Sequence, residues 1–340
     1  MVPTPAELLE CAHVVDIPLR VPFRGLTRRE AVLLRGPCGW AEFAPFAEYS
    51  DAEAAVWLAA AVEAGWNEPP TPVRDSIDVN ATVPAVPAAR VASVLQAFPG
   101  ARTAKVKVAG AGQDLAADTA RVAAVRQALG PGAAIRVDAN GGWDLQQARS
   151  ALRALSAYEL EYAEQPVASV EDLARLRVAL ARDGIEVAVA ADESVRRAGD
   201  PIRVARAGAA DLVVVKVAPL GGIRRALSIV ADCGLPAVVS SALDTTVGIA
   251  SGVRLAACLP TLPYACGLGT MALFDGDVSR ESLRPGGGSL TLEQARRGVA
   301  TVDPELLARH AAGPIRTQWW RERLERCAGI YLDETLGTRS

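Results

Sequence analysis

The stretch "ELEYAEQPVASVEDLARLRVALARDGIEVAVAADE", residues 159–193, contains the alternation that decides the fold. Its two ends, "ELEYAEQ" and "EVAVAADE", are short runs rich in apolar residues, which is typical of strands in a buried sheet. Between them, "VEDLARLRVALA" places apolar residues at helical spacing, so this segment is predicted to be a helix. A strand, a helix and a second strand in this order indicate two parallel strands joined by a helical crossover.

The same unit recurs on both sides of this stretch. Helices are predicted at 114–129, 170–181 and 221–233, each lying between two strand-like runs. Eight such runs follow one another at similar intervals, which favours a closed (β/α)8 barrel of the TIM type over an open doubly wound sheet. The predicted strands are "SIDVNAT" (76–82), "TAKVKVA" (103–109), "AIRVDAN" (134–140), "ELEYAEQ" (159–165), "EVAVAADE" (186–193), "DLVVVKV" (211–217), "PAVVSSA" (236–242) and "PYACGLG" (263–269).

The sequence outside the repeat has a different pattern. Residues 1–75 predict a strand meander, followed by a helix for which Ser50 is the N-cap. Residues 76–284 form the predicted barrel, and residues 285–340 form a C-terminal extension. Trp319 and Trp320 in this extension are expected to pack against another part of the molecule.

Composition limits the class of protein. Half of the residues are hydrophobic and the net charge is −3, so there is no basic surface of the kind that binds nucleic acid. No apolar run is long enough to cross a membrane, and the N-terminus lacks a signal-peptide pattern, so a cytoplasmic location is expected. Six cysteines without CxxC spacing predict reduced thiols rather than a metal or disulfide framework. The sequence does not indicate an oligomeric state.

Lysine is unusually scarce in this chain. Of 36 basic residues, only Lys105, Lys107 and Lys216 are lysines, and the rest are arginines. Lysine differs from arginine because it can lose its proton near neutrality when it is desolvated or lies near positive charge. The three lysines are therefore candidates for proton transfer. Lys105 and Lys107 are two residues apart on one strand, so both side chains point the same way.

The lysines belong to a series at the carboxyl ends of successive strands, where barrel enzymes carry their chemistry. In strand order, the ends present Lys107, Asp138, Glu164, Asp192 and Lys216. Each residue alone has a structural explanation, such as a helix cap or a surface salt bridge. Three carboxylates converging in a dry barrel mouth need a cation, and their oxygen atoms favour Mg²⁺, or Mn²⁺ in its place.

Such a site suits proton abstraction next to a carboxylate. The metal would make the α-proton of a bound small-molecule carboxylate more acidic, and a neutral lysine would remove it. The ammonium group on the opposite side would stabilise the enolate. A metal-dependent binding protein without turnover would keep the acids but would have no need for lysines in place of arginines.

Five motifs carry a family resemblance: "KVK" (105–107), "VDANGGW" (137–143), "YAEQP" (162–166), "ADES" (191–194) and "VVVKVAPLGG" (213–222). Together they resemble the enolase superfamily, in its muconate-lactonizing-like branch. The resemblance implies that Asp138, Glu164 and Asp192 bind Mg²⁺, that Lys107 is the base, and that Lys216 stabilises the enediolate. It also implies that residues 1–75 and 285–340 form an α+β capping domain over the barrel.

The same resemblance indicates substrate contacts. These are expected from Lys105, Asn140, Ser240, Ser241 and Gly267, and from two cap loops at residues 23–27 and 44–50. His13 and His310 both lie outside the barrel, which excludes the members that use a barrel histidine as base. The eighth strand ends in "CGLGT" without the Asp-x-Asp pair of the dipeptide epimerases, which argues against a substrate with a free amino group.

The reaction implied by the closest motif match is a carbon–oxygen lyase reaction. "SSALDTTVG" (240–248), "PYACGLGTMALFDGDV" (263–278) and the compact cap are most similar to the members that dehydrate 2-succinyl-6-hydroxy-2,4-cyclohexadiene-1-carboxylate to 2-succinylbenzoate in menaquinone biosynthesis. Racemisation of an N-succinylamino acid needs the same metal and both lysines, so it stays open as an alternative. Muconate cycloisomerisation is a third.

Overall fold

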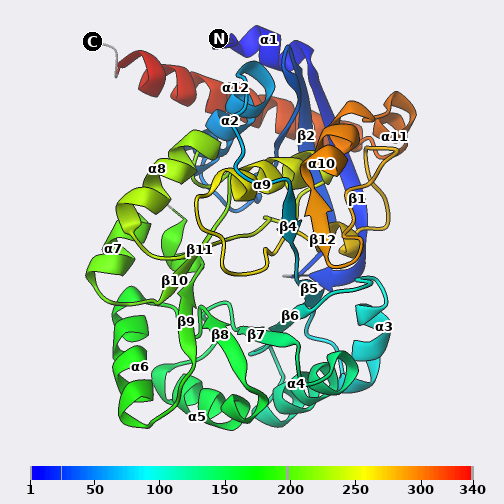
Figure 1. Ribbon diagram of the computed structural model, residues 1–340. Coiled ribbons are helices and arrows are strands. Elements are labelled where there is room, and N and C mark those ends of the chain that lie inside the picture. The colour runs from blue at the N-terminus through cyan, green and yellow to red at the C-terminus, as the bar shows by residue number, and fades with distance from the viewer. Residues whose placement is uncertain (1, 24, 197–198, 338–340) are drawn as a thin grey trace.

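A curved parallel sheet of seven strands forms the centre of the larger domain (Figure 1). The computed structural model describes residues 2–23, 25–196 and 199–337. The strands pair in chain order, so each one is joined to the next by a helical crossover. They are β5 (Ala81–Val83), β6 (Thr103–Lys107), β7 (Ala134–Asp138), β8 (Leu160–Glu164), β9 (Ala188–Ala191), β10 (Leu212–Val215) and β11 (Ala237–Val239).

Helices lie along the outer side of this sheet (Figure 1). Apolar residues of the strands and helices form one continuous core between the two layers. The strands are nearly all buried because helices cover one face while the barrel interior covers the other. The helices are α3 (Val91–Leu95), α4 (Leu115–Leu129), α5 (Leu145–Leu155), α6 (Val170–Arg182), α7 (Asp200–Arg206), α8 (Ile223–Cys233) and α9 (Thr246–Cys258).

The segment predicted as the eighth strand closes the barrel through only two bridges. Cys266 pairs with Val79 and Gly267 pairs with Ser240, both in parallel orientation. The N–H of Gly267 donates to the Val239 carbonyl at 2.8 Å. A Cβ on Gly267 would overlap the Ser240 hydroxyl, so the close approach here requires glycine. The predicted (β/α)8-type barrel is confirmed, with an eighth strand reduced to this contact.

The predicted first strand, residues 76–82, is divided in two. β4 (Ser76–Asp78) pairs antiparallel with β12 (Ser289–Thr291), and only β5 belongs to the barrel sheet. The prediction of one continuous strand over residues 76–82 was therefore wrong. The reason is tertiary, because Asp78 and Asn80 exchange backbone hydrogen bonds with Cys266 from the closing segment.

The cap is built on an antiparallel sheet of three strands, β1 (Ala12–Phe23), β2 (Leu26–Gly36) and β3 (Gly39–Phe43). Val32 and Leu34 of β2 pack in one core with α2 (Asp51–Trp66). The alternate residues Ala31 and Leu33 pack in a second core with Leu243 and other barrel residues. Both faces of the sheet are thus buried, one inside the cap and one against the barrel.

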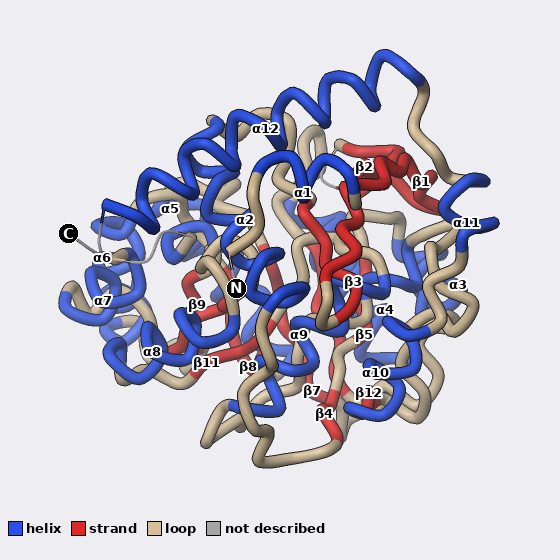
Figure 2. The backbone as a smooth tube through the Cα atoms, turned by 90° about the horizontal axis from the view of Figure 1, so that it is seen from above, coloured by secondary structure: helices blue, strands red, loops and turns tan. Residues whose placement is uncertain are grey.

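Helical segments complete the cap. The predicted N-cap is confirmed, because the Ser50 hydroxyl accepts from the Glu53 N–H at 3.3 Å and begins α2. α1 (Pro5–Glu10), α11 (Pro304–Arg309) and α12 (Pro314–Gly337) are further helices, and α12 crosses the outer side of the cap (Figure 2). By contrast, α10 (Leu292–Ala300) packs against α9, and its Leu292 and Ala295 belong to the barrel core. The domain limits at residues 75 and 284 stay a prediction.

The predicted packing of the tryptophan pair is confirmed. Trp320 is buried in the cap core, with its ring 6.0 Å from the Phe43 ring, and its Nε1 donates to Glu30 Oε2 at 3.0 Å. The six cysteines all lie within the described residues and are free thiols, as expected. No helix in the described part of the chain is long and apolar enough to span a membrane.

Candidate active site

Two lysines of β6 reach the interior of the barrel at its carboxyl end. Lys105 is buried, and its Nζ lies 2.7 Å from Glu164 Oε1 and 3.3 Å from Asp138 Oδ2. Lys107 lies nearer the mouth, where its Nζ is 2.5 Å from Asp138 Oδ2 and 2.7 Å from Asn140 Oδ1. Val106 between them points into the core under the helices, so strand alternation alone sends both ammonium groups to the site.

The carboxylates follow on the next three strands. Asp138 ends β7 and Glu164 ends β8, and the two residues pair across these strands. Asp192 comes directly after β9. Lys216 comes directly after β10, and its ammonium group forms an ion pair with Asp192. The structure therefore brings the predicted acids and lysines together at one end of the barrel.

Two turn residues hold the strand ends in place. Asn140 has a left-handed backbone with φ of 48°, and its N–H donates to Asp138 Oδ1 at 3.0 Å. Gln165, with φ of 38°, is fully buried, and its Oε1 accepts from the backbone N–H groups of Asp192 at 3.0 Å and Ser194 at 3.2 Å. Gln165 was missed as a site residue because a polar residue before proline is usual in any turn.

Burial and charge act against each other in this cluster. Burial by itself would raise the pKa of Asp138, but the Lys107 and Lys105 ammonium groups hold this pKa well below its usual range. Burial opposes the charge on Lys105, yet Glu164 and Asp138 raise the pKa of this lysine. Burial, together with the negative charge of Asp138, raises the pKa of Glu164 to about 8. Glu164 therefore lacks sufficient positive charge nearby.

The carboxylates fit a hard divalent cation. Glu164 Oε2 is buried and has no hydrogen-bond partner, so this oxygen is open to a ligand. Among the described residues, no three acidic, imidazole or thiol groups are gathered closely enough to hold a metal ion. Ammonium groups of Lys105 and Lys216 lie against the carboxylates Glu164 and Asp192. A divalent cation would supply the positive charge that Glu164 lacks, and the carboxylate oxygens present suit it.

A small pocket extends between the β6 lysines, Lys105 and Lys107, and Lys216. Ser241 Oγ lies 2.7 Å from Thr270 Oγ1, and Ser240 Oγ donates to the Gly267 carbonyl at 3.4 Å. The free space is about 30 Å³, room for about two water molecules. The lining residues are Phe23, Thr82, Lys105, Lys107, Asp138, Asn140, Asp192, Lys216, Ser240, Ser241, Ala242, Leu243, Gly267 and Thr270.

Several of these lining residues were not predicted. Thr82 follows the same strand alternation as the site residues on its neighbours and could have been found in that way. Leu243 lies in a loop and Thr270 begins a short 3-10 helix (Thr270–Leu273), and neither position carries such a signal. In the predicted cap loop at 23–27, Phe23 borders the pocket, and the centre of its ring lies 5.2 Å from Lys107 Nζ. Residue 24 of this loop lies outside the described residues.

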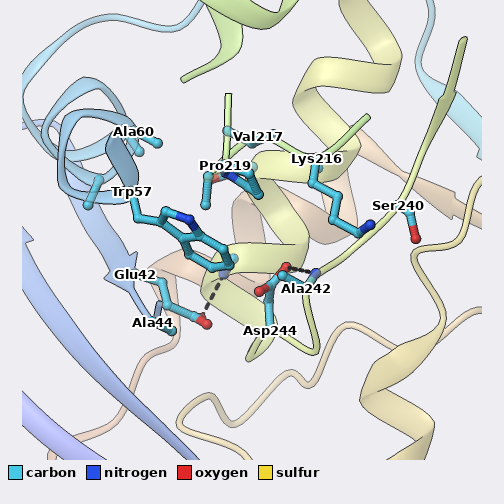
Figure 3. A pocket seen from close by; sticks show the side chains of 16 residues that line it. Glu42, Ala44, Trp57, Ala60, Lys216, Val217, Pro219, Ser240, Ala242 and Asp244 are labelled. Carbon is cyan, nitrogen blue, oxygen red and sulfur yellow. Dashed lines mark hydrogen bonds between the residues drawn. The ribbon is translucent and has the colours of Figure 1, made fainter. Parts of the chain in front are cut away.

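A second cavity lies behind Lys216, between the cap and the barrel. Figure 3 shows Trp57 and Glu42 from the cap on one side of it and Lys216 on the other. Glu42 accepts from Thr245 and Gly248 at the start of α9. Through these contacts the cap holds the loop after β11, which also forms the wall of the lysine pocket.

Arg29 of β2 also connects the cap to the loop after β11. Its buried guanidinium donates to the Leu243 carbonyl at 3.0 Å and also to the carbonyls of Ala44 and Ala242. Leu243 has a φ of 65°, which is strained for a residue with a branched side chain. The cap therefore contributes to the shape of the site as well as covering it.

Comparison with known families agrees with this architecture. A model described as "Enolase C-terminal domain-like" matches residues 87–301, and one described as "Enolase N-terminal domain-like" matches residues 14–65. The 2-chloromuconate cycloisomerase from Rhodococcus opacus superposes with a TM-score of 0.73 at 23% identity, covering 88% of this chain and 98% of that one. The L-Ala-D/L-Glu epimerase from Bacillus subtilis gives 0.70 at 23% identity over 82% and 94%. At this identity the two structures establish the fold of a capped, enolase-like barrel.

Sequence relatives are more specific. The o-succinylbenzoate synthase of Mycolicibacterium smegmatis is 53% identical over 330 residues, which is 97% of this chain and 98% of that protein. The o-succinylbenzoate synthase of Mycobacterium marinum is 52% identical over 96% and 97%. The chain belongs to the enolase superfamily and, within its muconate-lactonizing-like branch, to the family of the o-succinylbenzoate synthases. The family resemblance drawn from the five motifs is confirmed.

Proposed function

We propose that this protein is an o-succinylbenzoate synthase, a dehydratase that converts 2-succinyl-6-hydroxy-2,4-cyclohexadiene-1-carboxylate to 2-succinylbenzoate in menaquinone biosynthesis. The near full-length relatives of the same name support the reaction. The observation that carries the mechanism is the pocket itself, because Lys107 and Lys216 both line it. Lys107 ends β6 and Lys216 follows β10, four places away in the sheet order, so the two approach a substrate from opposite sides.

In the proposed mechanism, Lys107 acts as the base. Its neutral Nζ removes the proton from the carbon next to the substrate carboxylate, and the electron pair of that C–H bond moves into an enediolate. The pair then returns to form the ring double bond as the C–O bond to the hydroxyl group breaks. Lys107 returns its proton to the departing oxygen, so water leaves on the same face. Lys216 stays protonated on the opposite face and stabilises the enediolate charge.

Asp138, Glu164 and Asp192 are the proposed ligands of Mg²⁺, or of Mn²⁺ in its place. The ion would supply Lewis-acid stabilisation of the charge that develops on the substrate carboxylate. The support from this structure is the open Glu164 oxygen and the raised pKa of that residue, about 8, both of which indicate an uncompensated carboxyl group. Asp138 and Glu164, as paired residues on adjacent strands, are already side by side.

The remaining contacts of the substrate are proposed from the pocket lining. Lys105, Asn140, Ser240, Ser241 and Gly267 surround the lysine pair or support it. The free space of about 30 Å³ is smaller than a substrate with one six-membered ring and a succinyl chain needs, so we expect the cap loops to move when the substrate reaches the lysines. A cytoplasmic location, without nucleic-acid or membrane partners, stays a prediction.

The experiment compares two reactions on one purified protein. Loss of the diene absorbance of the cyclohexadiene substrate is followed with Mg²⁺ and again with EDTA, and solvent deuterium incorporation is followed at the α-carbon of an N-succinylamino acid. We expect rapid metal-dependent dehydration. Deuterium exchange without dehydration would instead indicate a racemase, and full dehydration in EDTA would contradict the metal site. If the protein acts on neither the cyclohexadiene substrate nor the N-succinylamino acid but lactonizes muconate, it would be a cycloisomerase.

A further inference from the structure

A chain of hydrogen bonds runs from Lys107 in the barrel to the cap. Lys107 Nζ donates to Asn140 Oδ1 at 2.7 Å, and Asn140 Nδ2 donates to Glu193 Oε1 at 3.2 Å. Arg196 Nη2 donates to the same Glu193 oxygen at 2.7 Å, while Arg196 Nη1 donates to the Tyr49 hydroxyl at 2.8 Å. We propose that Arg196 is a positioning residue, which orients Lys107 through Glu193 and Asn140 when the cap loop that carries Tyr49 lies against the barrel.

The Asn140 amide is the part of the chain that needs orienting. Lys107 has only donors, so it needs the amide oxygen, and the Glu193 carboxylate has only acceptors, so it needs the amide NH₂. The two neighbours therefore select one of the two amide orientations. Without the carboxylate, the amide could rotate and direct its NH₂ toward the ammonium group. Lys107 would then keep Asp138 as its only acceptor in this group, and Asp138 is also a proposed metal ligand.

Arginine suits the next position because its guanidinium can serve two acceptors in different directions at once. One nitrogen contacts Glu193 in the barrel and the other contacts Tyr49 in the cap. A lysine would offer a single nitrogen for both. The Arg196 and Glu193 side chains are 28% and 21% exposed, so water partly screens this ion pair and its contribution to folding stability is expected to be modest. Its effect is therefore expected on geometry at the site.

Tyr49, the cap end of this hydrogen-bond chain, is held in place by other residues of the cap. The Tyr49 ring lies 5.6 Å from the Phe46 ring and 5.9 Å from the Trp57 ring. Its backbone carbonyl accepts from Arg323 of α12 at 2.5 Å. Tyr49 thus reaches Arg196 only while its cap loop is seated. Since a substrate must pass the cap loops, the orientation of Lys107 would be completed as they close.

Arg203 provides a matched control for Arg196. Arg203 borders the groove that contains Tyr49, Glu193 and Arg196, but it pairs with Glu171 at 2.8 Å and is not part of the hydrogen-bond chain to Lys107. Arg196→Met and Arg203→Met remove the same charge from the same groove. Only the first breaks the connection between the cap and Asn140.

The test measures kcat, KM and the primary deuterium isotope effect with substrate deuterated at the α-carbon, at saturating Mg²⁺. This inference rests on the proposed function because it takes Lys107 as the base. For Arg196→Met we expect kcat to fall about tenfold, as for loss of one charged hydrogen bond, with KM within about twofold. The isotope effect on kcat should rise, since proton abstraction becomes slower relative to the other steps. Arg196→Lys should fall between the two, and Arg203→Met should behave like the parent.

The outcomes separate the two proposals. A parent protein that does not dehydrate the substrate overturns the proposed function. An active parent together with an Arg196→Met variant of unchanged kcat and isotope effect overturns this inference alone. If Arg196→Met does not fold, Tyr49→Phe decides, because it removes a single hydroxyl. Tyr49→Phe should lower kcat relative to the parent, by a smaller factor than that expected for Arg196→Met. An unchanged kcat in Tyr49→Phe contradicts the inference.

Discussion

Lys105→Met is expected to destabilise the metal-free protein strongly. The Lys105 side chain is 9% exposed, and its ammonium group contacts two carboxylates that are 0% and 1% exposed, Asp138 and Glu164. Removal of one partner from a buried ion pair costs about 3–5 kcal/mol, because the remaining charge stays buried without compensation. This corresponds to a fall of at least about 5 °C in the unfolding midpoint of a chain of this size.

The loss should depend on pH and on metal. The pKa of Glu164 is already raised to about 8, so below this pH the carboxyl group can take up a proton and relieve part of the strain. The difference between variant and parent in EDTA should therefore be larger at about pH 9 than at about pH 6. Saturating Mg²⁺ should reduce the difference, because the cation supplies the positive charge that the lysine no longer provides.

The assay is thermal unfolding of parent and variant in EDTA and in Mg²⁺, with Arg175→Met as the control. Arg175 pairs with Asp172 at the surface, with side chains 71% and 38% exposed, so its loss should change stability by less than about 0.5 kcal/mol. A Lys105→Met protein that unfolds with the parent in EDTA would refute the account of this cluster. A loss that is equally large with Mg²⁺ would show that no cation compensates these carboxylates.

Three further changes test the cap and the site. Gly36→Ala places a Cβ over the backbone carbonyl of Gly65, so it should cost about 3 kcal/mol or more in urea unfolding, whereas Gly329→Ala, in open space on α12, should gain about 1 kcal/mol. Burial and a neighbouring carboxylate raise the pKa of Glu42 from 4.5 to about 8. This group's contribution to stability is therefore full below pH 4.5 and is lost as the pH rises from 4.5 to about 8, and Glu42→Gln should flatten that decline. Asp192→Asn should weaken Mg²⁺ binding at least about tenfold by calorimetry, and equal affinity would exclude Asp192 as a ligand.

Most of the fold could be predicted because its elements follow local patterns. The helix-period segment at 170–181 and the flanking apolar strands correspond to α6, β8 and β9. The exceptions lie where the barrel closes. The short eighth strand and the divided first strand depend on close backbone contacts around Gly267, and such contacts between distant segments leave no periodicity in either one.

The site was predictable to the extent that composition marked it. Three lysines in a chain that otherwise uses arginine directed attention to β6 and to Lys216, and the positions at the carboxyl ends of successive strands then placed the acids beside them. Leu243 could not be found in this way, because its left-handed backbone and its contact with Arg29 arise from packing of the cap on the barrel. Arg196 could not be distinguished from the many other arginines until its neighbours were known.

The central claim is that Lys107 is the base of a metal-assisted dehydration, and Lys107→Arg tests it most directly. Arginine keeps the positive charge beside Asp138 but effectively never gives up its proton, so it cannot abstract one. The measurement is loss of diene absorbance by parent and variant at saturating Mg²⁺, after calorimetry has established that the variant still binds the metal. We expect dehydration to fall by at least about a hundredfold. Full dehydration by a metal-loaded Lys107→Arg protein would contradict the account.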